Sequence, residues 1–290
     1  MSRVRLTMLN SMAGSDLAVA LDRHVQEGLE ICDLKDGIFG KRLEELSHEQ
    51  VRSLADEIAA RGLKTYCLST SLGDHDLALG RERWRQVNSE ILDRVLSAAE
   101  ILKPALIRAI VAKDTFLPQG GEDNMNRVLA RYPWVAAAYD EIIGRINAAG
   151  FDVVLENEAH DCIITSPEDV CDLFATLKPG HRVSYTWDVQ NMWQMGTPPS
   201  RDVLDKLLPL LGMLHLKGGR AGSDGTLNDA SSLADASWPV ADIVRAAIES
   251  GRIEVICINP SHGTRAAGFD GWAVARDDLG FIRAADQRVA

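Results

Sequence analysis

The sequence predicts an α/β fold, a (β/α)8 TIM barrel that forms a single domain over residues 1–290. Eight short, almost continuously apolar segments alternate with amphipathic segments, as expected for parallel strands buried on both faces. The chain is 290 residues long and 46% hydrophobic, which suffices for a barrel that typically needs about 250 residues. A doubly wound open sheet is the alternative architecture, and it is weakened because no GxGxxG motif follows the first apolar segment.

The first half of the chain supplies four strand–helix units. The strands are expected at residues 4–9, 29–34, 63–69 and 105–112, and the helices at 16–27, 47–60, 81–101 and 134–149. Residues 10–14 are expected to form a turn. Ser47 and Gln50 form a capping-box sequence that starts the second helix, and Gly62 ends it. Residues 113–131 are the longest irregular insertion, which is typical of a functional lid or a disordered loop.

The second half supplies the other four units. Their strands are expected at residues 151–156, 183–188, 213–217 and 253–258, and their helices at 166–177, 200–208, 238–249 and from 271 onward. Ser166, Pro167 and Glu168 provide an N-cap, a proline at the first helical position and an acidic first turn. The glycine-rich residues 218–229 are expected to form a loop.

Charge and composition narrow the class of protein. A net charge of -11 argues against a nonspecific surface for nucleic acid or anionic membrane, since no basic field is available to collect phosphates. No apolar stretch reaches the roughly 18 to 20 residues of a membrane helix. The five cysteines lack paired CxxC spacing and are expected to be buried thiols of a reducing compartment. We therefore expect a cytoplasmic protein with no nucleic-acid or membrane partner, and homo-oligomerisation stays open.

Polar side chains end four of the strands in the second half. These are Glu156, Asp188, His215 and Asn259. Because the carboxyl ends of all strands in a parallel barrel open onto one face, these side chains are expected to converge on one site. Carboxylates and imidazole suit a hard or borderline divalent cation, whereas an amide is a weak ligand.

Each of these residues also has a purely structural interpretation. Glu156 could pair with Arg108 of the fourth strand, which could equally bind a substrate anion or hydroxyl. Asp188 could cap a helix or brace a loop, and His215 could be a hydrogen-bonded core residue. Lys217 lies two residues after His215 and should point to the same side, where it could hold a substrate oxyanion or act as an acid.

Several segments resemble a known superfamily. VVLENEAH, WDVQN with a following Gly-Thr-Pro-Pro, and LHLKGG, in this order, resemble the xylose-isomerase-like barrels of sugar isomerases and epimerases, most clearly over residues 150–250. LIRAIVAK resembles the arginine-bearing fourth strand of that superfamily. The resemblance implies a divalent cofactor metal (Mn, Mg, Co or Zn) held by Glu156, Asp188, His215 and a carboxylate from the eighth strand. It also implies that Glu156 moves protons beside a carbonyl.

The sequence departs from the superfamily pattern in three places. The eighth-strand carboxylate is replaced by Asn259 in an ungapped comparison, or by Cys257 in a gapped one. Asn191 stands where many relatives carry histidine, and Gly218 stands where the family often has aspartate. Because an amide cannot accept a proton at neutral pH, one-base chemistry such as dehydration, elimination or single-sided isomerisation is expected instead of two-base epimerisation. His262 could supply the missing ligand or acid, or be a plain loop residue.

The first functional hypothesis is therefore a metal-dependent isomerase, epimerase or lyase that acts on a small sugar, keto-sugar, polyol or sugar acid. The alternative is a catalytically degenerate barrel that binds a carbohydrate or a partner protein. Endonuclease-like phosphodiester cleavage ranks third, since too few histidines end strands to build its metal cluster. Glu156 and Lys217 are the expected catalytic residues. The expected substrate contacts are Arg108, Asn157, His160, Asn191 and His262.

Overall fold

The computed structural model describes residues 4–116, 121, 123–259, 261–286 and 289. Within these residues, eight parallel strands form one sheet in the order β1-β10-β7-β6-β5-β4-β3-β2. The strands are β1 (Arg5–Met8), β2 (Ile31–Leu34), β3 (Lys64–Ser69), β4 (Leu106–Ile110), β5 (Asp152–Glu156), β6 (Val183–Asp188), β7 (Leu211–Leu216) and β10 (Val255–Ile258). A single parallel bridge between Leu9 and Asp33 connects the two edges of the sheet, so the barrel is nearly closed. The predicted barrel is confirmed.

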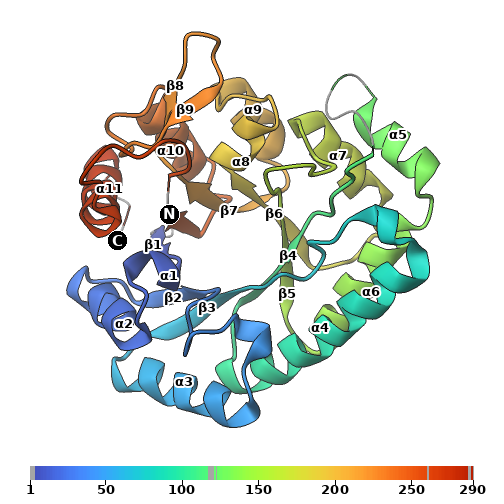
Figure 1. The fold of residues 1–290 in the computed structure, drawn as a ribbon, viewed down its shortest axis with the longest axis horizontal. Coiled ribbons are helices and arrows are strands. Elements are labelled where there is room, and N and C mark those ends of the chain that lie inside the picture. The colour runs from blue at the N-terminus through green and yellow to red at the C-terminus, as the bar shows by residue number, and fades with distance from the viewer. Residues whose placement is uncertain (1–3, 117–120, 122, 260, 287–288, 290) are drawn as a thin grey trace.

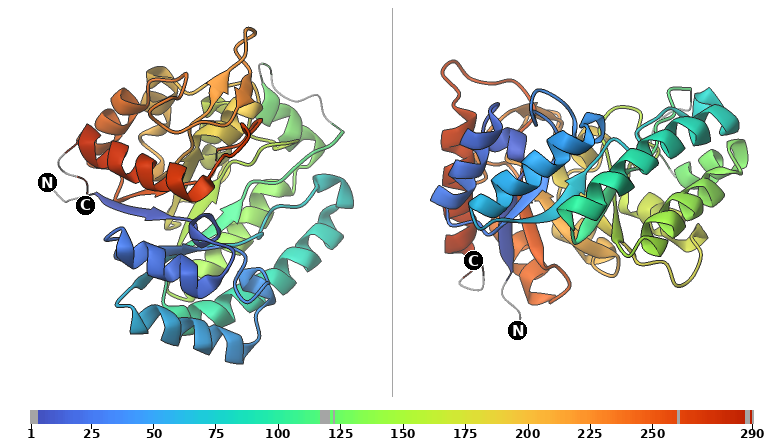
Figure 2. Two further views of the ribbon diagram at one scale, coloured as in Figure 1. Left: turned by 60° about the vertical axis from the view of Figure 1, so that its left-hand side comes forward. Right: turned by 90° about the horizontal axis from the view of Figure 1, so that it is seen from below.

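Helices surround the sheet (Figures 1 and 2). They are α2 (Leu17–Gln26), α3 (His48–Ala60), α4 (Arg81–Leu102), α6 (Val135–Ala148), α7 (Pro167–Thr176), α9 (Arg201–Leu207), α10 (Val240–Glu249) and α11 (Gly271–Ala285). The predicted capping box is present, because the Ser47 side chain accepts from the backbone N–H of Gln50 and the Gln50 side chain accepts from that of Ser47. No helix in the described part of the chain has the length and apolarity needed to cross a membrane.

Three segments differ from the sequence prediction. Residues 10–14, expected as a turn, contain the short helix α1 (Asn10–Ala13). The insertion 113–131 contains the helix α5 (Asn124–Arg131), although residues 117–120 and 122 lie outside the described part. The loop 218–229 contains a hairpin of β8 (Arg220–Ala221) and β9 (Leu227–Asp229). Two 3-10 turns, η1 (Leu43–Glu45) and η2 (Leu77–Leu79), were also not predicted.

Hydrogen bonds to two aspartates explain two of the unpredicted helices. Asp169 at the start of α7 accepts hydrogen bonds from the Asn124 side chain at 3.2 Å and from the Met125 backbone N–H at 3.2 Å, and so holds the start of α5. A further helix, α8 (Val189–Gln194), follows β6 without a loop because the Asp188 carboxylate caps it. The start of α5 thus depends on a long-range contact, whereas the start of α8 depends on a local cap.

Strand register places the polar strand ends beside each other. Asp188 of β6 lies opposite His215 of β7, and His215 lies opposite Cys257 of β10. A smaller apolar cluster includes Ile31, Val154, Met213 and Val255, which come earlier in their strands, together with Cys257. The barrel interior therefore changes from apolar to polar along the strand direction.

Four of the five cysteines are buried, as predicted. All are free, and Cys32, Cys67, Cys162 and Cys257 are buried. The prediction was wrong for Cys171, which is exposed on α7. This helix covers the barrel from outside, so one of its faces meets solvent whatever the mean hydropathy of the segment.

Gly73, in the loop after β3, provides a test of how tightly the barrel mouth is packed. Its φ is +87°, and a Cβ atom here would lie 2.1 Å from the Ile110 carbonyl oxygen at the end of β4. Gly62 also has a positive φ, but a Cβ there would meet nothing within 4 Å. We expect Gly62→Ala to lower the free energy of unfolding by about 1 kcal/mol and Gly73→Ala to lower it by roughly 1 to 3 kcal/mol more. Urea titrations measure both, and equal losses would contradict the close approach.

Candidate metal centre at the barrel mouth

Three of the predicted ligands meet at the mouth of the barrel. Glu156, Asp188 and His215 are buried, and each offers one ligand atom that lies within 4.8 Å of the other two. We call this group the mouth site. It forms because these residues lie at or near the carboxyl ends of three consecutive strands, β5, β6 and β7, whose side chains project to the same interior. Two carboxylates and one imidazole are a donor set that suits Mg²⁺, Mn²⁺, Co²⁺ or Zn²⁺.

Glu156 is held between two basic side chains. Its Oε2 accepts a hydrogen bond from Arg108 Nη1 at 2.7 Å, and its Oε1 lies 2.8 Å from His215 Nδ1. Burial alone would raise the pKa of Glu156, but the attraction of Arg108 and then of His215 outweighs it and lowers the pKa below its usual range. Burial likewise would lower the pKa of His215, and the Glu156 charge raises it well above its ordinary value. The structural interpretation of Glu156 as a partner of Arg108 is thus confirmed.

Asp188 has two structural partners. Its Oδ1 accepts from the backbone N–H of Asn191 at 3.0 Å and caps α8, as the helix-capping interpretation predicted. Its Oδ2 pairs with Lys217 Nζ at 2.7 Å. Lys217 therefore points to the same side of β7 as His215, as predicted, and it also contacts Asn191 Oδ1 at 3.0 Å and His262 Nε2 at 2.9 Å. Burial and then the Lys217 charge lower the pKa of His262 to about 4, so its imidazole is neutral at physiological pH.

Asn259 lies directly after β10 and reaches the same site. Its Nδ2 is 3.0 Å from His215 Nδ1, and its Oδ1 accepts a hydrogen bond from the Cys257 thiol at 3.2 Å. In this orientation the amide nitrogen, and not the oxygen, faces the imidazole. Asn259 would become an oxygen ligand at the mouth site only after its amide turns over.

The expected substrate-contacting residues differ in their exposure to solvent and in their hydrogen bonds. Asn157 is buried, and its amide bridges β5 and β6 through hydrogen bonds with the Asp188 backbone and the Tyr185 hydroxyl. Asn191 is buried as well, and its side chain contacts Glu158 and Lys217. His160 and His262 are exposed. The two asparagines therefore brace the site, whereas the two histidines have surface open to solvent.

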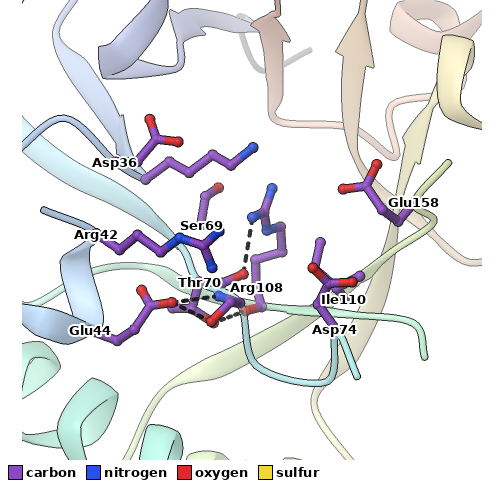
Figure 3. A pocket seen from close by; sticks show the side chains of 11 residues that line it. Asp36, Arg42, Glu44, Ser69, Thr70, Asp74, Arg108, Ile110 and Glu158 are labelled. Atoms are coloured by element: carbon purple, nitrogen blue, oxygen red, sulfur yellow. Dashed lines mark hydrogen bonds between the residues drawn. The ribbon is translucent and has the colours of Figure 1, made fainter. Parts of the chain in front are cut away.

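A cavity of about 210 Å³ opens beside the mouth site (Figure 3). Its lining is mostly polar and comes from β3, β4 and the loops after β2, β3 and β5: Lys35, Asp36, Arg42, Glu44, Ser69, Thr70, Ser71, Asp74, Arg108, Ile110 and Glu158. Arg108 connects the cavity to the mouth site, since it donates both to the Thr70 carbonyl at 3.0 Å and to Glu156. A small polar ligand in this cavity would lie against the Arg108 guanidinium.

Sequence reasoning missed two supporting residues and the role of a third. Gln190, on α8, donates to Ser261 Oγ at 2.9 Å and accepts from the His262 backbone N–H at 2.7 Å, so it positions the loop after β10. Gly218, noted only as a departure, leaves no room for a side chain, because a Cβ would lie 2.0 Å from the Ser231 carbonyl oxygen. Asp33, on β2, lies buried with Oδ2 3.6 Å from His215 Nε2. These contacts join residues 13 to 182 positions apart in the sequence, so local patterns give no signal for them.

No family model and no curated protein matches the sequence. Solved structures do match over nearly the whole chain. A xylose isomerase-like TIM barrel protein from Mycobacterium smegmatis in complex with magnesium is 17% identical, with a TM-score of 0.69 and 98% of this chain and 96% of that chain covered. An L-ribulose 3-epimerase is 16% identical, with a TM-score of 0.68 and 98% and 94% covered. A D-allulose 3-epimerase from Methylomonas sp. in complex with D-allulose is 13% identical, with a TM-score of 0.71 and 99% and 98% covered. The chain thus has the xylose isomerase-like TIM-barrel fold, as the resemblance implied.

The Arg108–Glu156 pair is expected to be strongly coupled. Both side chains are almost fully buried, so Arg108→Met would leave a carboxylate without its cation and lower the free energy of unfolding by about 3 to 5 kcal/mol. The double variant Arg108→Met/Glu156→Gln should lose less than the sum of the two single variants. Urea unfolding of all four proteins gives the coupling energy.

The exposed pair Arg85–Glu141 is a matched control, with its charged atoms 2.6 Å apart and side chains 38% and 45% exposed. Arg85→Met should cost less than about 1 kcal/mol, because water screens the pair. A similar cost for both arginines, or strict additivity in the Arg108 cycle, would show that the buried pair is not a coupled unit.

Proposed function

We propose that the protein is a metal-dependent isomerase, epimerase or lyase that acts on a small sugar, keto-sugar, polyol or sugar acid by proton transfer next to a carbonyl. The observation that carries the proposal is the mouth site, in which two buried carboxylates and an imidazole come within 4.8 Å at the strand ends of a barrel. The epimerases with the same fold support the choice of substrate class. The polar cavity beside Arg108 supports a small hydroxylated ligand.

Glu156, Asp188 and His215 would hold the divalent metal, with Asn259 beside them. Such an ion supplies Lewis-acid polarisation of a substrate carbonyl or hydroxyl oxygen. The donor set fits the ion, but Lys217 now neutralises Asp188 at 2.7 Å. The ammonium would have to move away from Oδ2 when the cation arrives, and its bonds to Asn191 and His262 give it other partners.

Glu156 is the proposed proton acceptor. While Arg108 and His215 contact it, its lowered pKa makes it a weak base. A substrate oxygen in the cavity that draws Arg108 away would remove the main stabilising charge and raise the pKa of Glu156 toward the range useful for proton transfer. Substrate binding and activation of the base would thus be one event.

Lys217 is the proposed electrostatic partner of the reaction. Its ammonium would hold a substrate oxyanion or return a proton, with Asn191 and His262 fixing its position. His160 and His262 would contact substrate hydroxyl groups at the open side, while Asn157 and Asn191 hold the walls. Because Asn259 cannot accept a proton, one-base dehydration, elimination or single-sided isomerisation fits these residues better than two-base epimerisation.

A degenerate, carbohydrate-binding or partner-binding barrel is the second candidate. The observation that favours it is that both mouth-site carboxylates already have protein cations, Arg108 on Glu156 and Lys217 on Asp188. A site neutralised in this way is stable without an added ion. The two candidates differ in whether the mouth site binds a hard cation and whether Glu156 is needed for turnover.

Glu156→Gln tests the catalytic assignment. The amide keeps the size of the side chain but cannot accept a proton, so turnover of the active compound from a keto-sugar, inosose and keto-acid panel should fall at least about a hundredfold. Glu168→Gln, on the exposed face of α7, is the control and should keep wild-type turnover. Wild-type activity in Glu156→Gln would remove Glu156 from its role, and no turnover of any panel member by the wild type with Mg²⁺ or Mn²⁺ would favour the binding protein.

Metal binding at the mouth site is tested by thermal unfolding. Mn²⁺ at a hundred times its Kd should stabilise the folded wild type by about 2.7 kcal/mol, and EDTA should reverse the shift. Asp188→Asn should lose most of this stabilisation. An unchanged melting temperature with Mn²⁺, or an equal shift in Asp188→Asn, would contradict the proposed ligand set.

A further inference from the structure

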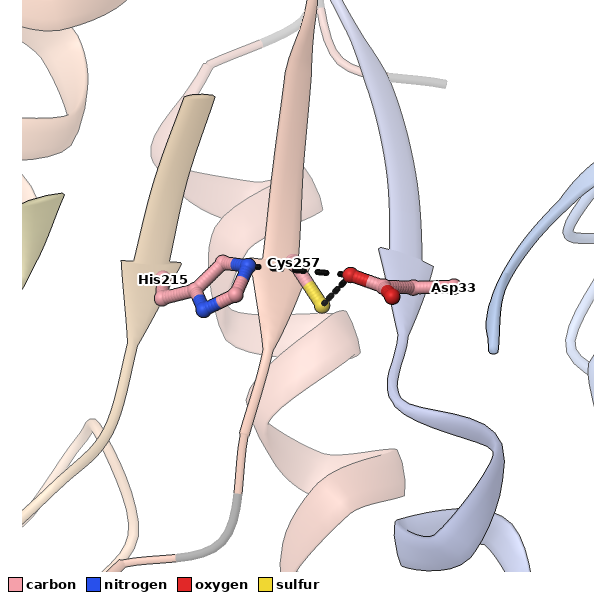
Figure 4. Close-up of side chains that lie close together, drawn as sticks. All are labelled: Asp33, His215 and Cys257. Carbon is pink, nitrogen blue, oxygen red and sulfur yellow. Dashed lines mark hydrogen bonds and ion pairs between the residues drawn. The ribbon is translucent and has the colours of Figure 1, made fainter. Parts of the chain in front are cut away.

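The second ring nitrogen of His215 faces a different group of side chains. Nε2 is buried and has no hydrogen-bond partner among the described residues. It points toward Asp33 of β2 and Cys257 of β10, as Figure 4 shows. The closest Asp33 oxygen is 3.6 Å from Nε2 and 3.7 Å from Cys257 Sγ. All three residues are essentially inaccessible to solvent, and their ligand atoms lie within 4.8 Å of one another.

The contact on the other side of the ring prepares His215 as a ligand. Glu156 Oε1 lies 2.8 Å from Nδ1 and fixes a proton on that nitrogen. In a neutral imidazole the lone pair is then on Nε2, directed at Asp33 and Cys257. Histidines that bind metals commonly donate their other N–H to a carboxylate in this way, which orients the ring and raises its basicity. Arg108 in turn holds Glu156 in place.

The separations fit a small cation with nitrogen, oxygen and sulfur ligands. With Zn–S near 2.3 Å and Zn–N and Zn–O near 2.0 to 2.1 Å, tetrahedral ligand atoms lie roughly 3.3 to 3.6 Å apart. The observed values of 3.6 and 3.7 Å are only slightly longer. The separation of 3.6 Å between Nε2 and Asp33 Oδ2 exceeds the normal length of a hydrogen bond from an N–H donor, so Nε2 is spaced for an ion better than for a direct hydrogen bond. The thiol of Cys257 donates a long hydrogen bond to the same oxygen.

We propose that Asp33, His215 Nε2 and Cys257 form a second metal site, which binds a thiophilic divalent cation such as Zn²⁺ or Co²⁺. We call it the inner site. The sulfur ligand selects borderline cations over Mg²⁺ and Mn²⁺, which prefer oxygen. Asn259 Oδ1, 3.2 Å from Cys257 Sγ, is the nearest candidate for a fourth ligand.

Charge balance also favours an ion here. A divalent cation that displaces two ligand protons leaves the net charge of the group unchanged. Added net charge is the main obstacle to burying an ion, and here the interior would gain none. Ser69 links the cavity to the inner site, since it lines the cavity and donates to Asp33 Oδ1 at 2.5 Å.

The inner site does not rest on the proposed function. The two sites share His215, and a neutral imidazole has one lone pair, so the ring serves either Nδ1 at the mouth site or Nε2 at the inner site. Mg²⁺ and Mn²⁺, which prefer oxygen ligands, would report on the mouth site, and a thiolate-to-cobalt band would report on the inner site, whose ligands include Cys257.

Co²⁺ titration of the reduced, full-length protein tests the inner site. The expected result is a saturable, stoichiometric thiolate-to-cobalt charge-transfer band in the near ultraviolet, which Zn²⁺ abolishes. Cys257→Ser and Asp33→Asn should each weaken Co²⁺ binding by about 10-fold or more, and Cys257→Ser should remove the band. Circular dichroism and thermal melting of the metal-free variants check that they are folded.

Two further variants separate the inner site from other sources of the signal. Cys171→Ser removes the exposed thiol, and Asp188→Asn removes a ligand unique to the mouth site. Both should keep the band. Any of four results would overturn the proposal. They are loss of the band in Cys171→Ser, retention of the band in Cys257→Ser, Co²⁺ binding without a sulfur band, and no Co²⁺ binding. None of these results depends on turnover, so the inner site and the proposed function fail separately.

Discussion

The position of the His215 ring is the constraint on which the site depends. Its Nδ1 meets Glu156 at 2.8 Å, and its Nε2 faces Asp33 at 3.6 Å, so one imidazole separates two buried carboxylates. Strand register sets this arrangement, because β7 places His215 between Asp188 of β6 and Cys257 of β10. In the neutral ring, a proton on Nδ1 leaves the lone pair on Nε2, which faces Asp33, and a proton on Nε2 leaves the lone pair on Nδ1, which faces Glu156. Both proposed metal sites follow from that single choice.

The barrel tolerates so much charge in its interior because the charges are paired. Among the described residues at the mouth, three carboxylates face three basic side chains: Asp33, Glu156 and Asp188 against Arg108, His215 and Lys217. Each unpaired member would be costly to bury, and each pair restricts the geometry of the next. A ligand or cation that enters must therefore exchange partners with the residues present. This requirement connects substrate binding at Arg108 to the basicity of Glu156.

Much of the architecture could be predicted from the sequence. The apolar runs identified the eight strands, and the residues that end them identified Glu156, Asp188 and His215 as a group. The same reasoning could not find α5, because Asp169 holds its start through a contact between residues 44 positions apart. It considered Asp188 as a helix cap but did not place α8, whose cap is local and whose six residues are too few for a clear apolar period. It also undervalued Asp33, because the residue that it faces is 182 positions away. Long-range partners of this kind leave no periodic pattern in the sequence.

Anomalous scattering from crystals loaded separately with Mn²⁺ and Zn²⁺ tests the central claim most directly. The account predicts a Mn²⁺ peak within coordination distance of Glu156 and Asp188, and a Zn²⁺ peak at His215 Nε2 within about 2.3 Å of Cys257 Sγ. Well-ordered loaded crystals with no peak beside the His215 ring at either wavelength would contradict it.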